Sequence, residues 1–158
     1  MITILLIVHG LLAVALLGAI THQALSVVAS GTASGRRSFF ARFRNVNGPA
    51  YAGPIVVMFV VTAVLGGLLY PAYRIDVRVL LEDTNSRSAN GIFEIKEHLI
   101  AVGLGALPAY WLAWRTPLAP ESASTRRYLT WILAFFVWWA FLVGHLLNNF
   151  KGLLPHQG

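Results

Sequence analysis

Four long apolar segments separated by charged connections constrain the fold of this chain more than any other feature. Each segment is longer than the roughly 20 residues that a helix needs to cross the ~30 Å hydrocarbon core of a bilayer. Backbone polar groups inside lipid must pair within their own segment, so each segment is predicted to be a helix. The segments run from Ile2 to Ala29, from Tyr51 to Tyr73, from Ile92 to Trp114 and from Tyr128 to Phe150.

The composition agrees with a membrane protein. Of the 158 residues, 57% are hydrophobic and only 11% are charged, whereas about 25% of the residues in a soluble domain are charged. This excludes a soluble enzyme, a disordered tail and, despite the net charge of +6, a nucleic-acid-binding module. The absence of cysteine excludes disulfides, thiolate metal sites, iron–sulfur clusters and covalently attached haem. We therefore predict an all-α integral membrane protein whose residues 1–158 form a single four-helix domain.

The charges of the connections predict the orientation of the bundle. Residues 30–50 carry four arginines and no acid, and residues 115–127 carry three arginines and one glutamate, whereas residues 74–97 carry five acids against four basic residues. Because basic connections remain on the cytoplasmic side, the first and third connections are predicted to be cytoplasmic. Both termini then lie on the outer side of an up-down bundle, in a bacterial inner membrane. The basic residues of the first connection are Arg36, Arg37, Arg42 and Arg44.

Four of the five histidines lie within the apolar segments. An ionisable residue inside a membrane span is costly, and it is a functional-site hypothesis by default. His9, His98 and His145 belong to three different segments and lie about 6–12 Å below the predicted outer boundary, at ~1.5 Å of rise per residue. His22 lies near the cytoplasmic edge, where we interpret it with Gln23 as an interfacial polar pair.

Three histidines at one level of a bundle predict a b-type haem in its outer half. Such a haem needs two imidazoles from different helices and space for the porphyrin between them. We predict that two of His9, His98 and His145 are the ligands, with His98 and His145 as the first pair. His9 and His22 are thirteen residues apart and therefore point about 140° apart on a helix, so we expect a single haem.

This arrangement resembles the small four-helix membrane b-type cytochromes, which are haem-carrying subunits that exchange electrons with quinone or with a c-type cytochrome. The resemblance covers all four segments, as helices with inward histidines. It implies an electron-transfer protein with haem b, associated with other membrane subunits or with further copies of itself. No phosphate-binding loop, nucleophile elbow or zincin motif indicates an independent catalytic activity.

Other interpretations of the same residues stay open. Glu94 and His98 are four residues apart and share a helix face. They could form a solvated helix start, or hold a Cu, Zn or Fe ion together with His9 or His145. Alternatively, Glu94 or Glu97 could orient the His98 imidazole or carry a proton.

A further alternative is a cofactor-free accessory subunit, whose fourth segment packs against larger partners. That segment carries aromatic and small residues on the face of His145, which could wall a haem or pack against lipid and other helices. These residues are Trp131, Ala134, Trp138 and Phe141.

Overall fold

The computed structural model describes residues 1–28, 46–79, 87–115 and 117–153, and none of these residues is in a β-strand. A π-helix at Arg74–Arg78 continues the helix Gly48–Tyr73, and a 3₁₀ turn at Pro120–Ser122 precedes the helix Ala123–Leu153. The prediction of an all-helical chain is confirmed, and each predicted segment falls on one helix. The four helices are α1 (Ile2–Val28), α3 (Gly48–Tyr73), α5 (Arg87–Trp114) and α6 (Ala123–Leu153).

Three of these helices are long and apolar enough to cross a membrane. They are α1, α3 and the segment Pro120–Leu147, which contains most of α6. Many of their large apolar side chains face outward, among them Ile4 and Leu11, which are both 67% exposed. Exposed apolar surface of this kind is unfavourable in water and favourable in lipid. The structure is therefore consistent with a membrane protein.

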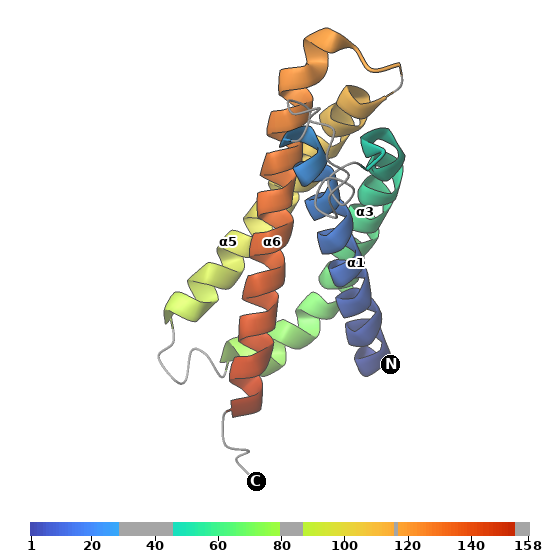
Figure 1. The fold of residues 1–158 in the computed structure, drawn as a ribbon. Helices are drawn as coiled ribbons and strands as arrows, with labels where there is room; N and C mark the ends of the chain where they lie inside the picture. Colours follow the sequence, from blue (N-terminus) through green and yellow to red (C-terminus); the bar gives the residue numbers. More distant parts are fainter. Residues whose placement is uncertain (29–45, 80–86, 116, 154–158) are drawn as a thin grey trace.

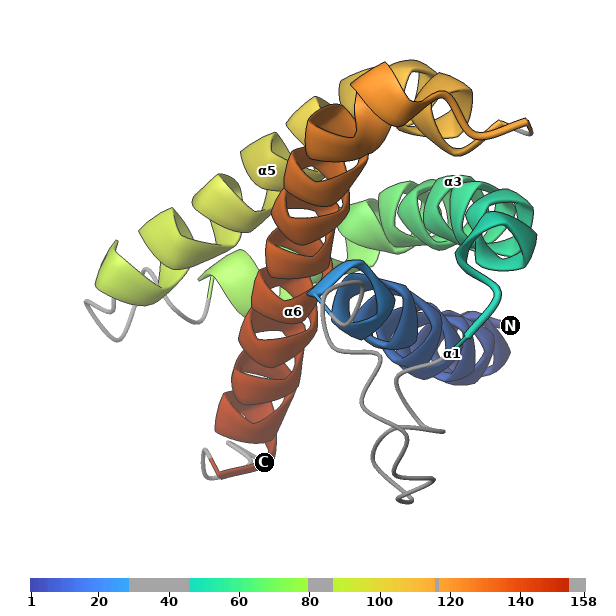
Figure 2. The same cartoon turned by 45° about the horizontal axis from the view of Figure 1, so that its top comes forward.

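The helices alternate in direction along the bundle. The N-terminal end of α1 and the C-terminal end of α6 lie at the same end of the molecule, at the bottom of Figure 1. All four helices converge at the opposite end and diverge toward the termini, as Figures 1 and 2 both show. The arginines of the first connection lie outside the described residues, so the cytoplasmic location of that connection stays a prediction.

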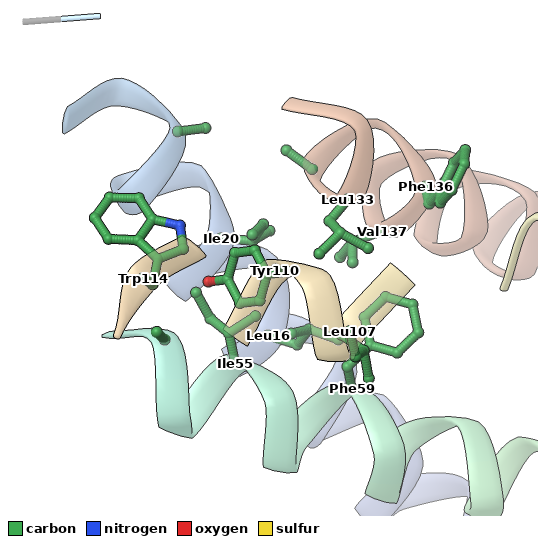
Figure 3. Packing of buried hydrophobic residues seen from close by; sticks show 13 residues of the cluster. Leu16, Ile20, Ile55, Phe59, Leu107, Tyr110, Trp114, Leu133, Phe136 and Val137 are labelled. Carbon is green, nitrogen blue, oxygen red and sulfur yellow. The ribbon is translucent and has the colours of Figure 1, made fainter. Parts of the chain in front are cut away.

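A cluster of thirteen buried residues fills the end at which the helices converge. Gly103 in α5 allows a close approach there, because a Cβ at this position would stand 2.6 Å from Cζ of Phe59. We call this part of the bundle the closed half. Figure 3 shows how side chains from all four helices meet in it, including Leu16, Ile20, Ile55, Phe59, Leu107, Tyr110, Leu133 and Val137.

A smaller cluster lies toward the diverging ends of the helices. Phe93, Val143 and Leu147 are its buried members. The C-terminal part of α3 reaches this cluster, where Tyr70 and Tyr73 pack against it. Pro71 cannot donate an intrahelical hydrogen bond, and α3 passes into the π-helix three residues later. We call this part of the bundle, around Phe93, the open half.

Candidate functional site

A fully buried glutamine joins three helices in the closed half. The Gln23 side chain on α1 is 0% exposed. Its Nε2 donates a hydrogen bond to the carbonyl oxygen of Gly48 at 2.9 Å, and its Oε1 accepts one from the hydroxyl of Tyr110. Gln23 therefore connects α1 to α3 and α5, and its side chain is enclosed by the bundle, whereas its depth in a membrane stays a prediction.

A second set of hydrogen bonds joins α5 to α6 in the same half. Nε1 of Trp114 donates to Oγ1 of Thr130 at 3.0 Å, and this hydroxyl donates to the carbonyl of Arg126 at 2.7 Å. The Trp114 ring also covers Gly48, where a Cβ would stand 2.5 Å from Cζ3. Because these buried polar groups have protein partners, their arrangement indicates a structural role.

The open half differs, because buried polar atoms there have no partner. Four side chains on three helices contain such atoms, and each lacks a hydrogen-bond partner within the part of the chain that the structure describes. Leaving a buried donor or acceptor unsatisfied costs about 1–3 kcal/mol. Several unsatisfied atoms in one native structure therefore need an explanation. The atoms are Nδ1 of His9, Oγ1 of Thr62, the hydroxyl oxygen of Tyr73 and Nε1 of Trp139.

His9 is directed toward α3. Its Cε1 lies 3.4 Å from the position that a Cβ on Gly66 would occupy, so the glycine makes room for the imidazole. The ring lies beside the backbone of Thr62 and interacts electrostatically with Lys96 on α5. His9 is therefore the predicted ligand that the structure places between helices.

The ring of Phe93 links three helices around the same region. Tyr73 stacks on it with 3.7 Å between ring centroids and 14° between planes. The ammonium of Lys96 lies 4.0 Å from the Phe93 centroid, a favourable cation–π contact. Trp139 on α6 packs against the cluster that contains Phe93. We refer to His9, Thr62, Tyr73, Lys96 and Trp139 together as the inner polar cluster, which extends over about 16 Å of α3 between Thr62 and Tyr73.

His98 lies on the exposed side of α5. Its Nδ1 is 2.7 Å from the backbone carbonyl oxygen of Glu94. A carbonyl oxygen can only accept a hydrogen bond, so in this contact Nδ1 carries the proton and Nε2 keeps a free lone pair. This is the tautomer that a metal ion or a haem iron requires of an Nε2 ligand.

The carboxylate of Glu94 is engaged with other groups. Its Oε1 lies 3.9 Å from Nη1 of Arg78 and 3.5 Å from Nδ2 of Asn90. Glu94 therefore orients the His98 imidazole through its backbone carbonyl, while its carboxylate takes part in a surface ion pair.

His145 on α6 is also exposed. Its ring is parallel to that of Phe141, with 6.2 Å between centroids and 1° between planes. His98 and His145 therefore face outward while His9 faces inward. Among the described residues, no three His, Asp or Glu side chains are grouped so that they could hold a metal ion.

Sequence reasoning missed most of the inner polar cluster. Lys96 was counted only among the charges of residues 74–97, although it also falls within the segment that begins at Ile92, where a lysine is expected to serve a function. Thr62, Tyr73 and Trp139 are common residue types in membrane helices and gave no signal. Comparison with known proteins adds no assignment, because no family model, no curated protein and no solved structure matches this chain.

Proposed function

We propose that the protein is a membrane b-type cytochrome, or the haem-carrying subunit of a larger redox complex, with His98 as one axial ligand. The supporting observation is the contact between Nδ1 of His98 and the Glu94 carbonyl. Histidines that bind metals usually donate their second ring N–H to a carbonyl or carboxylate, which fixes the tautomer and the ring orientation. His98 has this arrangement, and its Nε2 is on the exposed side of α5.

The second axial ligand is His145 or His9. His145 is exposed like His98, on the helix that packs beside α5, so a haem held by this pair would lie on the outer surface of the bundle, covered by lipid or by another subunit. His9 would instead bring the haem into the open half, where Lys96 and Tyr73 could donate hydrogen bonds to its propionates. In either place the haem would supply one-electron transfer, and the protein would set its orientation and surroundings.

The proposal includes α5 as a fourth span. Its 28 residues extend about 42 Å at 1.5 Å per residue, which exceeds the ~30 Å hydrocarbon core. Its charged first turns would then lie at the outer headgroups of a bacterial inner membrane, and the basic connections would be cytoplasmic. The acidic outer connection would attract a basic c-type cytochrome in a salt-dependent manner, and a quinone is the alternative electron partner.

The test is the visible spectrum of the purified protein, produced with an adequate haem supply. We expect a sharp α-band on reduction with dithionite, as for a low-spin b-type haem. His98→Ala should abolish this band, because it removes an axial ligand. His22→Ala is the matched control, since His22 lies near the opposite end of α1, and it should leave the band unchanged. His9→Ala and His145→Ala then identify the second ligand.

Two results would contradict the haem proposal. One is a protein without haem absorption under these conditions, and the other is full haem content in the His98→Ala variant. Copper, iron or zinc measured in the same sample at one ion per chain, without a haem spectrum, would favour a non-haem site at His98.

A cofactor-free accessory subunit is the second candidate, and the exposed aromatic side of α6 favours it. Trp131, Phe135 and Trp138 are 44%, 56% and 43% exposed. They line an open groove of about 290 Å³ between α1 and α6, which a neighbouring membrane helix could fill. This candidate predicts a featureless spectrum that His98→Gln does not change.

A further inference from the structure

We propose that a basic cavity between the C-terminal end of α5 and the start of α6 binds the headgroup of an anionic phospholipid. The proposal rests on the part of the proposed function that makes α5 a membrane span, and it does not depend on the haem. The connection that forms the cavity lies at the end of the bundle opposite the two termini, at the top of Figure 1. The cavity has a volume of about 400 Å³ and is lined by Leu112, Ala113, Arg115, Pro117, Ala119 and Ser122.

The side chain of Arg126 on α6 holds the walls of this cavity together. Its Nη1 donates hydrogen bonds to the carbonyl oxygens of Ala113 at 3.3 Å and of Ala119 at 3.0 Å. Ala113 belongs to α5 and Ala119 directly precedes the 3₁₀ turn, and both line the cavity. Because one guanidinium bonds to both walls, their separation is set by the fold, and a positive charge lies beside the cavity.

Arg115 supplies a second positive charge, on the wall of the cavity itself. Its side chain is exposed, and within the part of the chain that the structure describes its guanidinium has no ion pair or hydrogen bond. A guanidinium is a planar fork of N–H donors that matches the oxygens of a phosphate group. Ser122 also lines the cavity, and its hydroxyl can donate to the same group.

The net charge of the connection selects an anion for this cavity. Residues 115–127 carry three arginines against a single acid, Glu121. Phosphatidylcholine carries a cationic group next to its phosphate, and this group is repelled by Arg115 and Arg126. Phosphatidylglycerol has the phosphate without the cation, so its headgroup fits the charge of the cavity better.

The apolar surroundings of the cavity favour a lipid over a soluble anion. Leu112, on the wall of the cavity, is 64% exposed, and the neighbouring Leu118 is 40% exposed. The segment Pro120–Leu147 is long and apolar enough to cross a membrane, so the cavity lies where this segment begins. A soluble phosphate would leave both leucines in water, whereas the acyl chains of a phospholipid would cover them. Basic pockets between membrane helices are suited to anionic headgroups for these reasons.

The test is lipid binding to the full chain in a nonionic detergent, measured by native mass spectrometry. The probes are dioleoyl phosphatidylglycerol and dioleoyl phosphatidylcholine, which share their acyl chains and differ in headgroup charge. We expect one saturable phosphatidylglycerol site per chain, with a Kd roughly five- to tenfold below that of phosphatidylcholine. Arg115→Gln should raise the phosphatidylglycerol Kd by about three- to tenfold, and Ser122→Ala by about two- to fivefold.

Arg127→Gln is the matched control. It removes the same charge from an exposed arginine of the same region that does not line the cavity. At an ionic strength of about 0.15 M, which screens exposed charges, it should change the Kd by less than about twofold. Equal losses in Arg115→Gln and Arg127→Gln would overturn the proposal, because binding would then follow the net charge of the connection and not the cavity.

Two further results would overturn the proposal. Equal affinities for the two lipids would show that the cavity does not select an anionic headgroup. Displacement of phosphatidylglycerol by millimolar inorganic phosphate would assign the cavity to a soluble anion.

The visible spectrum of the same samples separates this proposal from the haem. Arg115→Gln leaves the proposed ligand His98 untouched, so its reduced α-band should equal that of the wild type. Selective lipid binding by a protein without a haem spectrum would contradict only the haem. A haem spectrum without selective lipid binding would contradict only the lipid site.

Discussion

The two halves of the bundle solve the same physical problem differently. In the closed half, the buried amide of Gln23 has hydrogen-bond partners on two other helices, and Thr130 both accepts and donates a hydrogen bond. In the open half, four buried polar atoms have no partner among the residues described. Satisfied polar groups fix how helices pack, whereas unsatisfied ones cost stability and are retained where a function requires them.

The helices also pack more closely in the closed half than in the open half. Gly48 and Gly103 of the closed half let the rings of Trp114 and Phe59 come close to the backbone. Among the residues described, the open half has a core of three buried side chains, and its helices diverge (Figure 1). We infer that the closed half holds the bundle together.

The largest expected effect is that of Gln23→Leu. Leucine fills a similar volume but leaves the buried hydroxyl of Tyr110 without its acceptor and removes the side-chain hydrogen bond to the carbonyl of Gly48. That carbonyl still accepts within the helix that begins at Gly48. With about 1–3 kcal/mol for the unsatisfied hydroxyl and about 1 kcal/mol for the lost hydrogen bond, we expect the free energy of unfolding to fall by about 2–4 kcal/mol. Reversible unfolding in mixed micelles, followed by circular dichroism, measures this change. A loss below ~0.5 kcal/mol, the level typical of neutral surface positions, would show that this network does not stabilise the fold.

The next effect concerns close packing at Gly48. A Cβ added there would stand 2.5 and 2.6 Å from two carbons of the Trp114 ring, so Gly48→Ala should destabilise the protein by about 1–3 kcal/mol. Gly18→Ala is the matched control, because a Cβ at Gly18 meets nothing within 4 Å.

In this control we expect no loss and up to ~1 kcal/mol of gain, from the better helix propensity of alanine. Thermal denaturation of the two variants in the same detergent compares them directly. Equal stability of the two variants would contradict the close contact between α3 and Trp114.

The smallest effect is expected in the open half. Thr62→Val and Tyr73→Phe remove hydroxyls that have no partner in the described structure, so no hydrogen bond is lost. We expect the free energy of unfolding to stay within ~0.5 kcal/mol of the wild type or to rise by up to about 1 kcal/mol. The unfolding assay used for Gln23→Leu measures it, and a loss as large as that of Gln23→Leu would erase the distinction between the two halves.

The helices themselves could be predicted from the sequence. Inside lipid, a long apolar segment can pair its backbone polar groups only within itself, so it forms a helix. The structure has a helix at each of the four predicted segments. The shared level of His9, His98 and His145 follows from the fixed rise per residue of a helix and stays a prediction. What a single sequence could not give is the rotation of each helix about its axis.

The rotation of each helix about its axis determines which of the predicted ligands face the interior of the bundle. His9 faces α3 beside Gly66, whereas His98 and His145 lie on exposed faces of α5 and α6. Lys96, two residues before His98, is thereby turned toward Phe93. The hydrogen bonds of Gln23 could not be predicted for the same reason, since its enclosure by three helices depends on contacts between residues far apart in the chain.

The sequence by itself determined that this protein is helical, apolar and suited to a membrane, because these properties follow from composition and from the length of local segments. The tertiary structure alone decided which polar residues meet. Side-chain partners across a bundle depend on helix rotation and spacing, and these are set by the packing of small against large side chains at each crossing. The full hydrogen bonding of Gln23 and the unsatisfied donors around Phe93 are both results of that packing.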